Sequence, residues 1–285
     1  MPCIGPSGQA RWRSLLIRAP MTCIHFQLFG RLAAFVSVLF AASLAQAASL
    51  DAHARYAVSL GGINVANMDI DLADDGTRYS LVLDATVSGL GSFVASGTAE
   101  ITASGDSRGE QLSPAAFALL TRANGETFSV NVEYAGGNAT AFQVEPPLIN
   151  NIDRIPIERS HLRGAGDMLS AFVLKGEELG PTLCRRTVGI FTGVERFDIA
   201  MAFAREDVAT SPRTGYQGPV ILCSVRYRPV SGHFTTSEMT TYLAQSDRIL
   251  IWYAPLGTSG YFIPYRVLLG TSMGDLSIVL TGLRF

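Results

Sequence analysis

Side chains able to do chemistry are few in this sequence and stand far apart. Beyond residue 48 the chain has three histidines, His53, His161 and His233. None has the H-E-x-x-H or H-x-H spacing that directs two imidazoles at one metal ion. No serine lies in a G-x-S-x-G turn, which would expose a nucleophile. The sequence therefore predicts no catalytic residue, no metal site and no cofactor.

Two acidic pairs, Asp69/Asp71 and Asp74/Asp75, flank a predicted turn. Paired carboxylates serve as general acid and base only when the protein holds their pKa values apart. Carboxylates at the turn between two strands normally face solvent. We therefore interpret these pairs as a solvated strand edge and its turn.

The remaining reactive side chains are Cys184 and Cys223, since Cys3 and Cys23 precede the cleavage site described next. Two cysteines in an exported chain have one intramolecular pairing. Closing a loop of roughly 40 residues contributes about 4 kcal/mol. Free thiols or a metal site are the alternatives, but no C-x-x-C motif or nearby histidine pair supports them. We predict a disulfide that joins two adjacent strands or their ends.

The N-terminal segment has the three parts of a secretory signal peptide. Arg31 supplies positive charge, Leu32–Leu44 form an apolar run too short for a permanent membrane span, and Ala45-Gln46-Ala47 is an A-x-A cleavage site. Met21 is the expected true start, with one long positively charged leader as the alternative. We expect residues 1–47 to be an upstream extension and signal peptide, cleaved after Ala47, and 48–285 to be a single β-rich periplasmic domain.

Charge narrows the choice of partner for the mature segment. Residues 1–47 hold four of the 22 Lys and Arg and none of the 24 Asp and Glu, so residues 48–285 carry a net charge near −6. Nucleic acids and anionic membrane surfaces both attract basic faces. We therefore expect neither as a partner. No apolar run after residue 48 is long enough for a transmembrane helix in the mature form.

Apolar and polar residues alternate along much of the mature segment, most clearly over 79–88, 127–134 and 196–203. This period of 2 predicts strands with one buried and one solvated face. Turn signals separate the runs at Gly61-Gly62, Asp74-Asp75-Gly76, Gly136-Gly137-Asn138 and Gly274-Asp275. Short connections of this kind predict antiparallel meanders.

The run after Gly62 changes phase, because Ile63 and Val65 have one parity whereas Met68, Ile70 and Leu72 have the other. A bulge near Ala66-Asn67 would reconcile the two halves, and bulges curve a sheet. We therefore expect a mainly all-β fold, in which a curved antiparallel sheet closes into a β-barrel or half-barrel with one short mid-chain helix.

That helix is expected within residues 161–175. Met168, Leu169, Phe172 and Val173 have helical spacing there, and Asp167 is a suitable N-cap. The helix either covers the concave side of the sheet or is a connector packed on the sheet edge. In the first case its apolar residues would line a space for a ligand.

Two further groups of residues could form a binding surface. Arg186, Arg196, Arg226 and Arg228 could lie near Glu195, Asp198 or Glu238, either as cross-strand ion pairs or as a contact for an anion or glycan. An aromatic-rich hairpin spans residues 249–265. Together with the helix, it supplies the ligand-lining candidates Met168, Phe172, Trp252, Tyr253, Tyr261 and Phe262.

The segment Tyr56–Ala66, the blocks Cys184–Ile199 and Cys223–His233, and the hairpin Trp252–Arg266 resemble the bacterial family catalogued as domain of unknown function 3108 (DUF3108). The resemblance covers nearly all of the mature segment and is strongest for rhizobial-type members, which tend to have Asp at the position of Thr192. It implies export and a β-rich fold, without a reaction. Other periplasmic β-spirals and half-barrels carry lipids or lipoproteins or maintain the envelope, by analogy only.

We therefore expect a non-enzymatic periplasmic envelope protein that binds a lipid or other apolar ligand, or an envelope protein, on a concave sheet face. One alternative is an outer-membrane β-barrel, because Phe285 is the last residue and Leu283 and Val279 share its parity. The other is an enzyme acting on cell-wall material.

Overall fold

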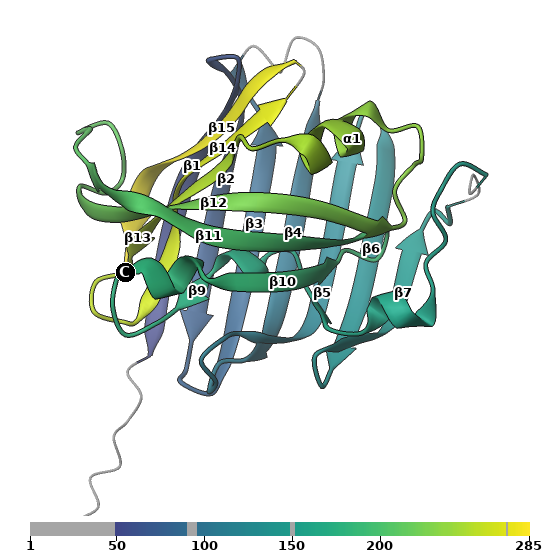
Figure 1. Ribbon diagram of the computed structural model, residues 1–285, viewed down its shortest axis with the longest axis horizontal. Coiled ribbons are helices and arrows are strands. Elements are labelled where there is room, and N and C mark those ends of the chain that lie inside the picture. The colour runs from purple at the N-terminus through teal and green to yellow at the C-terminus, as the bar shows by residue number, and fades with distance from the viewer. Residues whose placement is uncertain (1–48, 90–95, 149–151, 272) are drawn as a thin grey trace, which may run out of the picture. The chain divides into compact units, whose positions relative to one another are not determined.

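The computed structural model describes residues 49–89, 96–148, 152–271 and 273–285 (Figure 1). The predicted upstream extension, signal peptide and cleavage site all lie outside the described residues. Within them, no helix combines the length and apolar character needed to cross a membrane.

The described residues form one large, mainly antiparallel sheet, which confirms the predicted fold class. Neighbouring strands follow the order β7-β6-β5-β4-β3-β2-β1-β15-β14-β13-β12-β11-β10-β8, and β9 pairs with β14. Their bounds are β1 Leu50–Leu60, β2 Ile63–Asp74, β3 Arg78–Val87, β4 Gly97–Asp106, β5 Ser113–Ala123, β6 Glu126–Ala135, β7 Asn138–Glu145, β8 Ala165–Gly166, β9 Leu174–Lys175, β10 Arg186–Phe191, β11 Arg196–Ala209, β12 Gly218–Ser231, β13 Ile249–Pro255, β14 Tyr261–Thr271 and β15 Gly274–Arg284.

Two meanders, β1–β7 and β10–β15, meet where β1 pairs with β15. The sheet curls so that strands β10–β12 cross in front of β3–β6 in Figure 1. Strands β6 and β10 contact each other across the interior, where the Tyr134 hydroxyl of β6 donates to the Phe191 carbonyl of β10 at 2.6 Å. Among the described residues, the free edges β7 and β8 come together near Asn138, at the Asn138–Arg163 bridge and through hydrogen bonds from Ala165 N to Gly137 O and from Gly164 N to Asn138 Oδ1. The result is a nearly closed, barrel-like sheet.

Strand β2 contains the predicted bulge. Val58 of β1 pairs with Ala66 and the next residue, Ser59, pairs with Asn64, so Val65 is the extra residue. The insertion explains the change of phase in the sequence, because it lets Ile63, paired with Leu60, and Met68, paired with Tyr56, share one side of the sheet although their parity differs. Ile63 lies at the strand end and is 49% exposed. The predicted turns at Gly61-Gly62, at Asp75-Gly76 and at Gly136-Gly137 lie between strands, and Gly61 and Gly62 both have positive φ, +56° and +85°. Gly274 and Asp275 instead begin β15.

The predicted helix at 161–175 is wrong. This stretch forms a 3₁₀ turn η2 (Arg159–Leu162), β8, a second 3₁₀ turn η3 (Ser170–Phe172) and β9. Gly164 has a positive φ of +59°, and Asp167 Oδ1 accepts hydrogen bonds from Leu169 N and Ser170 N, both at 2.7 Å. These two donors are ones that a helix N-terminus leaves free, so their bonds to Asp167 do not by themselves end a helix. The helix does not continue because Leu174 and Lys175 pair with Phe262 and Tyr261 of β14. Helical spacing of four apolar residues does not reveal this strand pairing.

The α-helix of the described chain is instead α1 (Glu238–Gln245). Ser237 is its N-cap, and its hydroxyl accepts a hydrogen bond from Thr240 N at 3.1 Å. A serine followed by eight residues without glycine or proline was the available sequence signal.

Candidate functional site

Cys184 and Cys223 form a disulfide with a Cα–Cα distance of 5.4 Å. Cys184 ends the 3₁₀ turn η4 (Pro181–Cys184), whereas Cys223 lies on β12. The expectation that the bond joins adjacent strands is wrong, because β11 lies between β10 and β12 in the sheet. The bond instead ties the turn η4 to β12. It thereby anchors residues 159–184, from η2 to η4 and hereafter the mid-chain segment, to the sheet.

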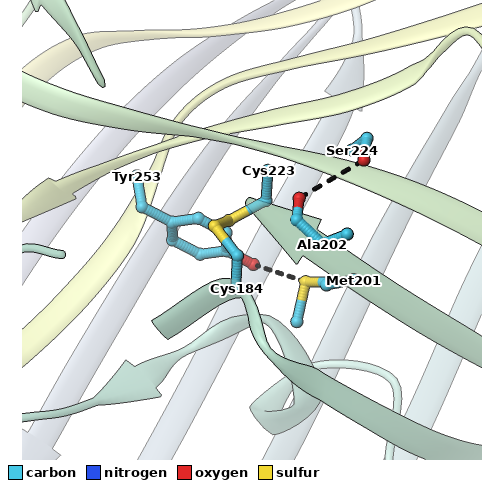
Figure 2. The surroundings of a disulfide bond; sticks show 6 residues. All are labelled: Cys184, Met201, Ala202, Cys223, Ser224 and Tyr253. Carbon is cyan, nitrogen blue, oxygen red and sulfur yellow. Dashed lines mark hydrogen bonds between the residues drawn. A yellow bond between two sulfur atoms is a disulfide. The ribbon is translucent and has the colours of Figure 1, made fainter. Parts of the chain in front are cut away.

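The disulfide is enclosed by side chains of β11, β12 and β13. Both cysteines are 0% exposed, and Figure 2 shows Tyr253 beside the bond with its hydroxyl directed at Met201 Sδ, 3.8 Å away. Burial raises the pKa of the Tyr253 hydroxyl far above its usual value. The two sulfur atoms lack the exposure that redox-active cysteines require, so this bond is structural.

An apolar cavity of about 300 Å³ lies inside the curled sheet, between the inner face of the sheet and the mid-chain segment. Strands β1 to β4, β14 and β15 contribute most of its walls, and the segment around η3 contributes the rest. Its lining residues are Ala52, Ala54, Tyr56, Met68, Ile70, Leu72, Leu81, Leu83, Ile101, Met168, Leu169, Phe172, Val173, Leu256, Ile263, Pro264, Val267 and Ile278. Its volume is at the lower end of the range for small-molecule pockets, roughly 300–1,000 Å³.

The cavity offers almost nothing polar to a ligand. The one hydroxyl in its lining, that of Tyr56, donates to the Pro264 carbonyl at 2.8 Å, and burial raises its pKa strongly. A polar ligand group placed here would lose its hydrogen bonds to water without replacement, at a cost of about 1–3 kcal/mol. The site is therefore suited to hydrocarbon.

The structure divides the six predicted lining residues into two groups. Met168 and Phe172 line the cavity, together with Leu169 and Val173 from the same segment. Trp252, Tyr253, Tyr261 and Phe262 do not. Tyr253 and Phe262 pack in the cluster around the disulfide. The two remaining aromatic residues are held by carboxylates: Trp252 Nε1 donates to Asp207 at 3.0 Å, and the Tyr261 hydroxyl donates to Asp74.

Sequence analysis missed the small residues that open the cavity. Ala52 and Ala54 lie on the inner parity of β1, where larger side chains would fill the space. The available sequence signal is the alternation of Ala52, Ala54, Tyr56 and Val58, which indicates a strand with small residues on its inner side.

A buried carboxyl lies directly before the cavity-lining Met168. Asp167 is 0% exposed and accepts hydrogen bonds from Leu169 N, Ser170 N and the Ser170 hydroxyl. Burial raises the pKa of this carboxyl despite those hydrogen bonds. Asp167 therefore fixes the turn that carries Met168 and Phe172 toward the cavity.

The arginine-rich strands form ion pairs at one carboxylate. Asp198 accepts from Arg196 Nη1 at 2.5 Å and also from Arg228. Burial by itself would raise the pKa of Asp198, but the two arginines lower it below its usual value. Arg196 Nε also donates to the His161 carbonyl at 3.0 Å, so this cluster holds the mid-chain segment. Arg226 instead donates to the Ser246 carbonyl at 3.0 Å.

The histidines remain apart, but the structure brings His53 next to Asp69 and Asp71. His53 Nδ1 lies 2.7 Å from Asp71 Oδ1, and Nε2 lies 3.3 Å from Asp69 Oδ1. Within the described ranges, no set of three His, Cys, Asp or Glu side chains converges as metal ligands.

The fold and the disulfide-anchored interior define a β-barrel-like protein with an apolar cavity. The chain matches "Protein of unknown function (DUF3108)" over residues 55–281, and it belongs to that family. It is also similar in fold to a solved β-barrel-like protein of domain of unknown function DUF1849 from Brucella abortus, with 12% identity and a TM-score of 0.50. That similarity covers 83% of this chain and 98% of the other. A search of curated proteins found no match.

Proposed function

We propose that this protein is a non-enzymatic component of the periplasmic cell envelope that binds the hydrocarbon part of a lipid or similar ligand. The observation that carries the proposal is the cavity, whose lining is apolar and whose one hydroxyl is already bonded to the protein. Small side chains at Ala52 and Ala54 leave the space open. The polar head of such a ligand would remain outside the cavity.

Export is part of this proposal and rests on the signal-peptide pattern that ends at Ala47. The buried Cys184–Cys223 bond supports it, because structural disulfides persist in oxidising compartments such as the periplasm. We also propose the relationship to rhizobial-type members. Thr192 Oγ1 accepts a hydrogen bond from Glu195 N at 3.1 Å, and an aspartate side chain can fill the same role in a turn.

The polarity of the sheet favours this proposal over an outer-membrane barrel. Inward residues such as Leu72, Leu81 and Val132 are buried, whereas the outward residues Asp84 and Glu133 are exposed. Membrane-spanning barrels place their apolar band on the outside. A cell-wall-acting enzyme remains the other alternative, and hydrolysis assays on cell-wall fragments would test it.

Displacement of a fluorescent fatty acid by n-alkanols of increasing length tests the proposal. Each methylene that enters the cavity contributes about 0.8 kcal/mol, so affinity should rise about fourfold per carbon and level off once the cavity is full. Ala54→Phe fills the cavity and should abolish displacement. Ala116→Phe is the matched control, because Ala116 is exposed on β5 outside the cavity.

Equal binding by the folded Ala54→Phe and Ala116→Phe proteins would refute a ligand site in the cavity. Affinity that does not depend on alkanol length would also refute it. Mass spectrometry of lipids extracted from protein purified from the native periplasm would then identify the natural ligand.

A further inference from the structure

We propose a second binding site, distinct from the cavity, at the open seam of the barrel. There, the free edge of β7 and the segment 154–157 form a groove that receives an extended peptide carrying a carboxylate. The peptide would add a strand to β7 and place its carboxylate on Arg154.

The first observation is the free edge of β7. On one side β7 pairs with β6 over its whole length, and on the other it meets the mid-chain segment at the Asn138–Arg163 bridge. From Thr140 to Glu145, no other strand of the described chain pairs with this outer side. Such an edge presents unpaired N–H and C=O groups, which are the template for strand addition.

The second observation is a groove of about 430 Å³ along that edge. Phe142 and Val144 of β7 line it together with Ile155 and Ile157, and Val194 lines it from the turn after β10. The lining segment 154–157 contains Pro156, which lacks an N–H donor, so this segment does not offer β7 a complete partner strand. The alternating apolar side chains of an extended peptide would fit along these lining residues.

The lining segment is fixed in place by the protein itself. Ile155 N donates to the His233 carbonyl at 3.0 Å, Gly232 N donates to the Ile155 carbonyl at 2.8 Å, and Thr235 N donates to the Asp153 carbonyl at 2.7 Å. These bonds anchor residues 153–155 to residues 232–235. The groove is therefore formed before any peptide enters it, which lowers the entropy cost of binding.

The third observation is the charge of Arg154, which lines the same groove. Its Nη1 donates to the Gly232 carbonyl at 2.5 Å, and its guanidinium carbon lies 4.0 Å from the centre of the Phe234 ring. Within the described residues Arg154 forms no ion pair, and its buried Nε has no hydrogen-bond partner. A partly buried arginine without a carboxylate favours an anionic ligand group.

The occupant follows from the three observations together. A fatty acid could bind Arg154 and the apolar walls, but it has no backbone groups for the edge of β7. An extended peptide with a free carboxylate satisfies all three features of the groove. We therefore assign a peptide, with a fatty acid as the contrasting outcome of the test.

The test begins with selection from a pool of randomised heptapeptides with free C-terminal carboxylates. The full mature chain should enrich peptides with alternating apolar residues. The best peptide is then measured by fluorescence anisotropy in four forms: as the free acid, as the C-terminal amide, and N-methylated either at its odd or at its even residues. Amidation should weaken binding about tenfold or more, and N-methylation on one parity should abolish it.

Arg154→Gln should weaken binding of the acid about as much as amidation does, and should leave binding of the amide unchanged. Arg159→Gln is the matched control, since Arg159 is exposed on the neighbouring turn η2. The peptide-based comparisons need no protein variant, so they remain decisive if Arg154→Gln fails to fold.

The proposal is overturned if no peptide is enriched, or if the amide or both N-methylated forms bind as well as the acid. It is equally overturned if Arg159→Gln weakens binding as much as Arg154→Gln. Competition by dodecanoate, combined with indifference to N-methylation, would show that the groove takes a fatty acid instead. Peptide binding that persists in the Ala54→Phe protein would show that this site is distinct from the cavity.

Discussion

Breaking the Cys184–Cys223 bond should lower the free energy of unfolding by about 4 kcal/mol. The two cysteines are 39 residues apart in sequence, and closing a loop of that length removes the corresponding entropy from the unfolded chain. For a domain of about 150–250 residues, each kcal/mol shifts Tm by about 2–4 °C, so a loss of roughly 8–16 °C is expected.

Urea unfolding of the same protein with and without reductant measures this difference without changing the packed side chains. Because both cysteines are 0% exposed, reduction should require unfolding, and reductant alone should act slowly on the native protein. The double variant Cys184→Ala/Cys223→Ala is the control, and its stability should not respond to reductant. The reasoning fails if oxidised and reduced chains unfold at the same urea concentration, or if the unfolded, unreduced protein contains two free thiols.

Two further predictions concern the turn after β10 and the turn beside the cavity. Gly193→Ala should destabilise the protein by about 1–3 kcal/mol more than Gly137→Ala, as measured by urea unfolding. Both glycines have positive φ, but a Cβ on Gly193 would lie 2.2 Å from Val130 Cγ1, whereas a Cβ on Gly137 would meet nothing within 4 Å. Equal losses of unfolding free energy in the two variants would contradict this prediction. The pKa of Asp167 is raised in the folded state by burial, so its contribution to stability is present below its unfolded pKa of about 4 and is lost as pH rises through the folded pKa. Asp167→Asn should therefore gain stability relative to the parent as pH rises above about 4, and a parallel pH dependence of the two proteins would refute this assignment.

The regular parts of the fold could be predicted because they depend on local pattern. The alternation over 79–88 places Tyr79 and Leu81 on the buried face, and both side chains are buried in β3. The change of phase after Gly62 predicted a bulge, which the structure has at Val65. The pairing of Cys184 with Cys223 followed from the absence of another cysteine after residue 48.

The interior could not be predicted in the same way. Trp252 and Tyr261 were expected beside a ligand because they are aromatic and close in sequence, but each is hydrogen-bonded to a carboxylate elsewhere, Asp207 and Asp74. The segment 161–175 has helical spacing, yet its last two residues, Leu174 and Lys175, pair with Phe262 and Tyr261 of β14, which are distant in sequence.

The sequence by itself determined the strands, the turns and the disulfide pairing. Alternating burial and glycine conformation act over a few residues, and two cysteines leave one intramolecular pairing. Only the tertiary structure decided where the cavity and the seam lie. The cavity exists because β1 to β4, β14 and the residues around Met168 converge from distant parts of the chain. The seam exists because, among the described residues, the outer edge of β7 is bridged to the segment before β8 at Asn138 and is not paired with another strand further along. Both depend on the register and curvature of the whole sheet, which no short stretch of sequence specifies.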